Sequence, residues 1–81
     1  MSEVQVKAYS QNLDLRSKLF GHTLSDDPHI RSAAYRALAN FEPDDSIITC
    51  LLNGLEDDDI FVRRSAGSVL IEFGYLNARA K

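Results

Sequence analysis

The stretch Asp58-Asp59-Ile60-Phe61-Val62-Arg63-Arg64-Ser65-Ala66 decides the fold of this chain, because a related stretch lies 32 residues before it. Asp26-Asp27-Pro28-His29-Ile30-Arg31-Ser32-Ala33-Ala34 aligns with it without a gap. The same offset superposes apolar positions on both sides: Leu15 on Ile47, Leu19 on Leu51, Phe20 on Leu52, Leu38 on Leu70, and Phe41 on Phe73. A period of roughly 20–50 residues is typical of solenoid repeats. The sequence therefore predicts two repeats, at about 12–41 and 44–74.

Each repeat contains two amphipathic segments with helical spacing. The first segment of the later repeat carries an apolar stripe made of Ile47, Ile48, Leu51, Leu52 and Leu55. Its second segment has an inner face of Val62, Ala66, Val69, Leu70 and Phe73. The earlier repeat predicts helices over about 12–22 and 28–40, the second with an inner face of Ile30, Ala33, Ala34, Ala37, Leu38 and Phe41. No useful length of strand alternation occurs, so we expect an all-α fold, an α-α superhelix (solenoid) of two helical hairpins.

The residues between these segments are typical of helix ends. Asp27 before Pro28 predicts an N-cap followed by the first helical residue, and Asp59 holds the same place in the later repeat. After Pro43, either Asp44 or Ser46 can cap the next helix. Gly74 predicts the end of the last helix.

The segment 55–66, with its Leu, Asp, Val-Arg and Ala, resembles the consensus of HEAT-like repeats. It is most similar to the short repeats of bilin lyases and related proteins, and the resemblance covers about residues 12–74. The first copy departs at one place, where Thr23 aligns with Leu55 and Leu24 lies one position away. The resemblance implies two HEAT-like hairpins in a scaffold, an adaptor or a lyase subunit, and the fold alone does not choose among these.

The resemblance also implies that the Arg after Val or Ile pairs with an Asp of an inter-helix turn. The matching residues are Arg31 and Arg63, and the candidate partners are Asp26, Asp27, Asp57, Asp58 and Asp59. Physical chemistry agrees, because a cation in the first helical turn opposes the helix dipole and needs nearby carboxylates. We interpret these acids as structural, with a binding role as the alternative.

Length, charge and cysteine content restrict the class of protein. The 81 residues fit a single domain, 1–81, with an N-terminal extension (1–11) that is either an ordered cap or a loose tail, and a C-terminal tail (75–81). A net charge of −3 argues against binding nucleic acid, which needs a concentrated basic surface. No apolar run is long enough for a membrane span, and no signal peptide opens the chain. Cys50 is the only cysteine, so we expect a cytoplasmic protein.

Sharper chemical roles fit the sequence poorly. The acidic runs lack the ligand spacing of an EF-hand loop, and His22, His29 and Cys50 lack the tight spacing of a zinc site. No histidine is expected near enough to Cys50 to act as the base that a nucleophilic thiol needs. We therefore expect no catalytic activity, no metal site and no cofactor.

The remaining candidates are surfaces. Stacked hairpins place their second helices side by side, and the aligned outward positions are Ser32, Tyr35, Arg36, Arg64, Gly67 and Ser68. Tyr and Arg are enriched in protein interfaces, so this row is a candidate protein-binding face, with an ordinary solvated face as the alternative. The gap at Gly67 should form a depression beside Tyr35. We expect a protein-interaction module; the alternative is an accessory or lyase-like subunit acting on a bilin chromophore protein.

The open end of the second hairpin is another candidate surface. Tyr75 and Leu76 should contribute to an apolar end face. Such faces tend to be covered, so we expect a homodimer through this end or docking onto a larger partner.

Overall fold

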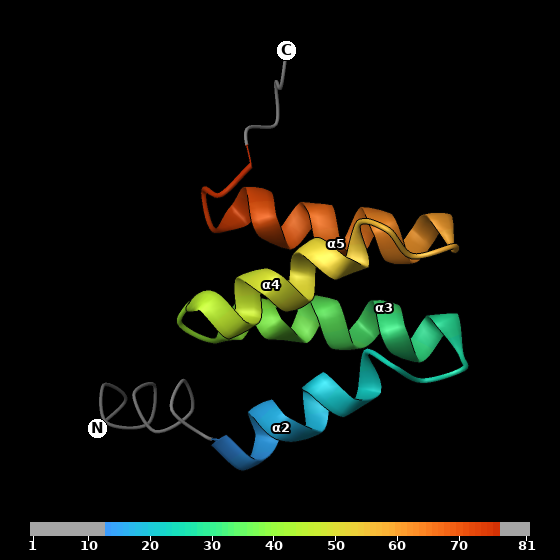
Figure 1. Cartoon of the computed structure of the whole chain (residues 1–81), viewed down its shortest axis with the longest axis horizontal. Coiled ribbons are helices and arrows are strands. Elements are labelled where there is room, and N and C mark those ends of the chain that lie inside the picture. The colour runs from blue at the N-terminus through green and yellow to red at the C-terminus, as the bar shows by residue number, and fades with distance from the viewer. Residues whose placement is uncertain (1–12, 77–81) are drawn as a thin grey trace.

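The computed structural model describes residues 13–76, and within them every regular element is helical. The elements are the α-helices α2 (Leu13–His22), α3 (Pro28–Ala37), α4 (Asp45–Gly54) and α5 (Ile60–Glu72), with a 3-10 turn η1 (Leu38–Asn40) after α3 (Figure 1). The prediction of an all-α fold is confirmed. The N-terminal extension 1–11 and most of the tail 75–81 lie outside the described residues.

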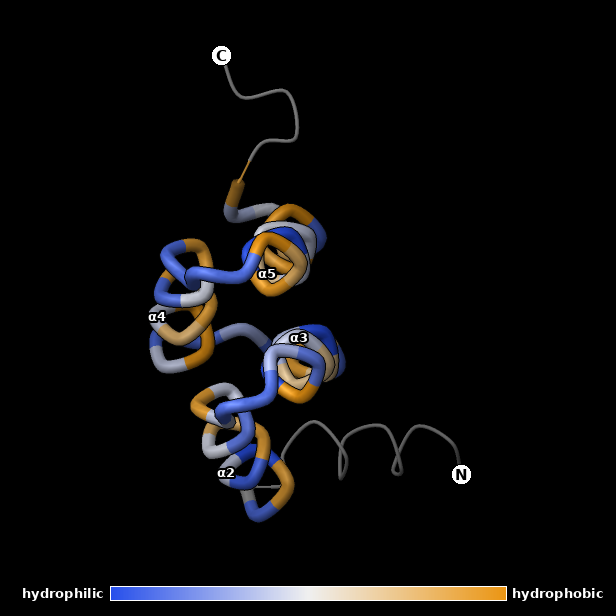
Figure 2. Tube along the Cα trace, turned by 90° about the vertical axis from the view of Figure 1, so that its right-hand side faces the viewer, coloured by the Kyte–Doolittle hydropathy of each residue, from blue (hydrophilic) through white to orange (hydrophobic). Residues whose placement is uncertain are grey.

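The four α-helices form two layers. In the end-on view, α2 and α4 lie in one layer and α3 and α5 in the other (Figure 2). Contacts are most extensive between α3 and α5, followed by α4 with α5 and α2 with α3. The first hairpin, α2–α3, therefore lies against the second hairpin, α4–α5, and the second helices of the two hairpins are neighbours.

Three aspartates begin three of the helices. The Asp27 carboxylate accepts from the backbone N–H of His29 at 2.9 Å, and Pro28 follows it as the first helical residue. The Asp59 carboxylate accepts from Phe61 N (2.8 Å) and Val62 N (3.2 Å). Of the two predicted caps for α4, the structure uses Asp44, which accepts from Ile47 N at 2.9 Å. The cap positions were therefore readable from the sequence.

Asp44 also joins the two hairpins. Its carboxylate pairs with the guanidinium of Arg16 on α2, which lies 5.0 Å from the centre of the Phe20 ring. The N–H of Ile47 is the main reason that the pKa of Asp44 is lowered, and Arg16 adds to the effect. The charged cap thus connects the start of α4 to α2.

The end of α5 is a Schellman motif. Tyr75 N donates to Leu70 O and Gly74 N to Ile71 O, both at 2.9 Å, and Gly74 has φ of +80°. Only glycine adopts this left-handed conformation at low cost. The predicted stop at Gly74 is confirmed.

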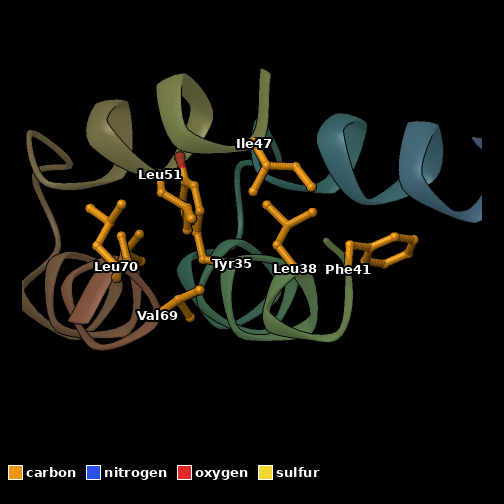
Figure 3. Packing of buried hydrophobic residues seen from close by; sticks show 9 residues of the cluster. Tyr35, Leu38, Phe41, Ile47, Leu51, Val69 and Leu70 are labelled. Carbon is orange, nitrogen blue, oxygen red and sulfur yellow. The ribbon is translucent and has the colours of Figure 1, made fainter. Parts of the chain in front are cut away.

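The core lies between the layers (Figure 3). The α4 stripe buries Ile47 and Leu51 fully, and its other predicted members are half-buried. The inner face of α5 is also as predicted, with Phe73 half-buried and four residues fully inside: Val62, Ala66, Val69 and Leu70.

The inner face of α3 is as predicted at Ala34, Leu38 and Phe41, which are buried, and differs at other positions. Ile30 and Ala33 are exposed, whereas Tyr35, expected outside, is only 4% exposed and belongs to the core cluster. Two overlapping stripes fit the helical period here. The structure buries the one that contains the large Tyr35 ring, because this ring removes far more apolar surface from water than an alanine does.

Tyr35 lies over a glycine of the second hairpin. A Cβ added at Gly54 would stand 2.9 Å from Tyr35 Cζ and 2.6 Å from Ala66 Cβ. Neither distance is compatible with a real Cβ contact, so Gly54 lets α4 approach both α3 and α5. Leu51 of α4 and Leu70 of α5 belong to the same core cluster as the ring (Figure 3).

We expect Gly54→Ala to lower the free energy of unfolding by about 1–3 kcal/mol, because the added methyl overpacks this contact. Gly67→Ala is the matched control. Its Cβ would meet only Leu55 Cδ2, at 3.5 Å, so the better helix propensity of alanine should leave stability unchanged or raise it by up to about 1 kcal/mol. Urea denaturation followed by circular dichroism measures both. Equal losses in the two variants would contradict the role given to Gly54.

Candidate functional site

A shallow open groove runs between α3 and α5, on the side away from α4. We call it the α3–α5 groove; it is lined by Pro28, His29, Ser32, Ala33, Arg36, Ala37, Ala39, Asp59, Phe61, Arg64, Ser65, Ser68, Val69 and Glu72. Its walls are the outward positions of two neighbouring helices, brought together by the packing of the hairpins. The sequence predicted that a surface of this kind would form here.

Four of the six residues predicted for the binding face line this groove: Ser32, Arg36, Arg64 and Ser68. Ser32 and Ser65 share a hydrogen bond between their hydroxyls, at 2.6 Å, which joins α3 to α5. The side chains of Arg36 and Arg64 are exposed, and the groove also holds the carboxylates of Asp59 and Glu72. The groove therefore carries charges of both signs on a lining that also contains apolar side chains.

Tyr35 and Gly67 do not belong to the groove, which corrects the sequence-based expectation. Tyr35 is buried, and burial raises the pKa of its hydroxyl. The glycine beside Tyr35 is Gly54, whereas Gly67 lies beside Leu55. The expected depression between Gly67 and Tyr35 therefore does not form, because the Tyr35 ring is part of the core.

Phe61 is the largest apolar residue among the groove residues that the sequence reasoning missed. Its side chain is 65% exposed, although it is one of the largest apolar residues in the chain. A signal for it existed, since Phe61 aligns with His29 and falls outside the buried stripe of α5. The groove thus presents one exposed aromatic ring, two guanidinium groups and several hydroxyls.

A half-buried ion pair joins the two hairpins. Arg31 Nε donates to Asp57 Oδ2 and Arg31 Nη2 to Asp57 Oδ1, both at 2.9 Å. The two side chains are only 16% and 12% exposed. Such bidentate, charge-assisted bonds are stronger than neutral ones. The predicted pairing of Arg31 with a turn aspartate is confirmed, and the partner belongs to the following hairpin.

Arg31 also fastens its own turn. Its Nη1 donates to the backbone carbonyls of Ser25 (2.9 Å) and Asp26 (3.2 Å). The Arg31 guanidinium is the main cause of the lowered pKa of Asp57, and the hydrogen bonds to Asp57 raise the pKa of Arg31. Asp58 Oδ1 lies 3.4 Å from Arg31 Nη2 on an exposed side chain, so Asp57 is the principal partner.

Arg63 differs from the expectation, because no carboxylate among residues 13–76 pairs with it. Its Nη1 donates to the backbone carbonyl of Asp57 at 2.8 Å. The other predicted acids divide by position: Asp27 and Asp59 cap helices, and Asp26 is exposed in the turn. These acids serve the local structure of the turns.

Cys50 and the two histidines do not come together. Cys50 is half-buried, burial raises the pKa of its thiol, and the thiol lies 3.8 Å from the Thr23 hydroxyl. His29 is exposed, beside Asp27. Among the described residues, no group of three His, Cys, Asp or Glu side chains could hold a metal ion. No helix in residues 13–76 has both the length and the apolar character required to cross a bilayer.

Tyr75 and Leu76 differ in their exposure to solvent. Tyr75 is exposed, as expected for an end face, whereas Leu76 is half-buried against the core cluster. The Schellman motif folds the chain back here, because Leu76 N also points to Leu70 O, at 3.3 Å.

Comparison with known proteins gives no further guide to function. No family model matches the chain, and no curated protein or solved structure matches it. The similarity to HEAT-like repeats therefore stays a prediction from the sequence, and the function has to be inferred from the geometry.

We expect Asp57→Asn to lower the urea midpoint at pH 7, because it leaves the half-buried Arg31 without its counter-charge. The folded-state pKa of Asp57 is lowered, so its contribution is complete above the unfolded-state value of about 3.9 and is lost as pH falls through the lower folded-state pKa. The difference between wild type and variant should therefore shrink below about pH 4. Asp58→Asn is the control and should change the midpoint less. A difference that does not vary between pH 7 and pH 2.5 would contradict the pairing.

Proposed function

We propose that this chain is a protein-interaction module of two HEAT-like repeats, and that the α3–α5 groove binds a segment of another protein. The observation that carries the proposal is the exposed Phe61 ring in a groove that also presents Arg36 and Arg64. The chain supplies binding and no chemistry of its own.

The composition of the groove suits a protein ligand. Aromatic and arginine side chains dominate the energetics of protein interfaces, because they combine a large contact area with directional hydrogen bonds. Phe61 offers the apolar area, and the exposed guanidinium groups of Arg36 and Arg64 offer donors for carboxylates or backbone carbonyls. Asp59 and Glu72 offer acceptors within the same groove.

The shape of the groove also favours a polypeptide. Small side chains, Ser32, Ala33 and Ala37 on α3 and Ser65 on α5, line it between the larger groups. They allow a bound backbone to come close to both helices. A site for a small molecule normally encloses most of its ligand, and this open groove does not. An extended or helical segment of a protein fits it better.

The proposal of two HEAT-like repeats rests on equivalences at the 32-residue offset. The N-caps Asp27 and Asp59 correspond, and so do the bonds from Arg31 Nη1 to Ser25 O and from Arg63 Nη1 to Asp57 O. Thr23, which the alignment places on Leu55, is buried, while Leu24 is exposed. Side-by-side packing of α3 and α5 supports the same interpretation.

The bilin-protein alternative has no support from a particular contact in the described residues. It makes a distinct prediction, because a bilin-binding chain would elute with coloured material after incubation with bilin. Absence of colour together with capture of a protein ligand favours the interaction module.

Affinity capture from native lysate with mass spectrometry, followed by calorimetry on the captured protein, tests the groove. We expect Phe61→Ser to weaken the measured Kd by about tenfold or more, as loss of an aromatic anchor does. Arg64→Glu should also weaken binding. The matched controls are Leu24→Ser and Lys18→Glu, which change exposed residues outside the groove. Equal affinities for the groove variants and their controls would place the binding surface elsewhere.

A further inference from the structure

Arg31 and Arg63 are held in the same way by their own turns. Each donates Nη1 to the backbone carbonyl six residues earlier, Arg31 to Ser25 at 2.9 Å and Arg63 to Asp57 at 2.8 Å. They differ at the other nitrogens. Arg31 Nε and Nη2 hold the Asp57 carboxylate, whereas no described residue accepts from Nε or Nη2 of Arg63. The two guanidinium groups thus make the same backbone contact, and only the first pairs with a carboxylate of the described residues.

Arg63 lies on a stripe of α5 together with Ile60, Gly67 and Ile71, which we call the Arg63 stripe. These positions are spaced by three, seven and eleven residues from Ile60, so they share one side of the helix. Ile60 is 51% and Ile71 42% exposed. The stripe is therefore apolar around a single cation.

The corresponding stripe of α3 shows what such a surface contacts. Its members Arg31 and Tyr35 reach the second hairpin, at Asp57 and Gly54 respectively. At the 32-residue offset these positions become Arg63 and Gly67. On α3 these positions contact the next hairpin. On α5 the equivalent positions form the Arg63 stripe, which could contact a further hairpin in the same way.

We propose that the Arg63 stripe docks a helical hairpin of another protein, whose inter-helix turn carries an aspartate two residues before the cap of its second helix. Asp57 has this position relative to the cap Asp59. The partner's carboxylate accepts from Arg63 Nε and Nη2, and its apolar side chains cover Ile60 and Ile71. Burial of Arg63 without a carboxylate is costly, so the charge selects acidic turns against neutral ones.

A second copy of this chain, added in the same direction, does not meet that requirement. The residue of the first hairpin that corresponds to Asp57 is Ser25. Ser25 Oγ accepts from Asp27 N at 3.1 Å, as Asp57 Oδ1 accepts from Asp59 N at 2.9 Å, so the two turns are alike. Ser25 is neutral, however, and leaves Arg63 without a counter-charge. A second copy stacked in this direction is therefore not the partner.

Gly67 sets the fit at the centre of the stripe. It stands where α3 carries Tyr35, and a Cβ built on it meets only Leu55 Cδ2, at 3.5 Å. The surface therefore has room for a partner side chain that the interface between the two hairpins does not have. Gly67→Tyr would give the stripe the side chain that fills the existing interface.

A variant of the full chain with a second copy of residues 44–75 inserted after Tyr75 tests the proposal, because the added hairpin brings its own Asp57-type turn. We expect a single cooperative urea transition with a higher midpoint than wild type, and a further rise when Gly67→Tyr is included. Arg63→Gln should remove most of the increase, and Lys18→Gln, at an exposed site on α2, should remove none of it.

Two results would overturn the proposal. The first is an added hairpin that unfolds in a separate transition, or whose stabilising effect does not change with Arg63→Gln. This result would have to hold both with Gly67 and with Gly67→Tyr. The other is a concentration-dependent dimer of the unextended chain, seen by sedimentation and lost in Arg63→Gln, since a second copy would then be the occupant. A monomer at high concentration supports a different partner. None of these measurements involves Phe61 or Arg36. Failure of this proposal can therefore be told apart from failure of the α3–α5 groove proposal.

Discussion

The guanidinium of Arg31 is the contact on which the arrangement of the two hairpins depends. It holds the backbone of its own turn at Ser25 and Asp26, and the carboxylate of the next turn at Asp57. One planar group thereby joins two turns, although Arg31 and Asp57 are 26 residues apart in the chain. The Tyr35 ring over Gly54 fixes the middle of the same interface. With both contacts in place, α3 and α5 lie side by side and line the α3–α5 groove.

Sequence reasoning was most successful where a structural role depends on local chemistry. Asp27, Asp59 and Gly74 could be assigned from their neighbours alone, because a cap acts on residues within one turn of itself. The stripes of α4 and α5 were also readable, since each contains one continuous set of large apolar residues. Arg31 could be assigned to an acidic turn because a cation at a helix start requires counter-charge.

Prediction from the sequence failed where the burial or pairing of a side chain depends on which helix packs against it. α3 contacts α2 and α5 at once, and its small residues allow two phases of burial. The space over Gly54, which a Cβ would fill, accommodates the Tyr35 ring inside the core. Likewise, the aspartates near Arg63 are identical in type to those near Arg31, and only the three-dimensional order of the hairpins shows which arginine receives a carboxylate.

The layered arrangement also affects how fast the chain can fold. The long-range polar contacts, such as Ser32 with Ser65 and Arg31 with Asp57, join residues about one hairpin apart, and none of these contacts links the two ends of the described chain. Closing such short loops costs little entropy, and helical proteins with mostly local contacts fold within about microseconds to milliseconds. The chain can therefore reach its native topology through contacts that each span about one hairpin, without first bringing its two distant ends together.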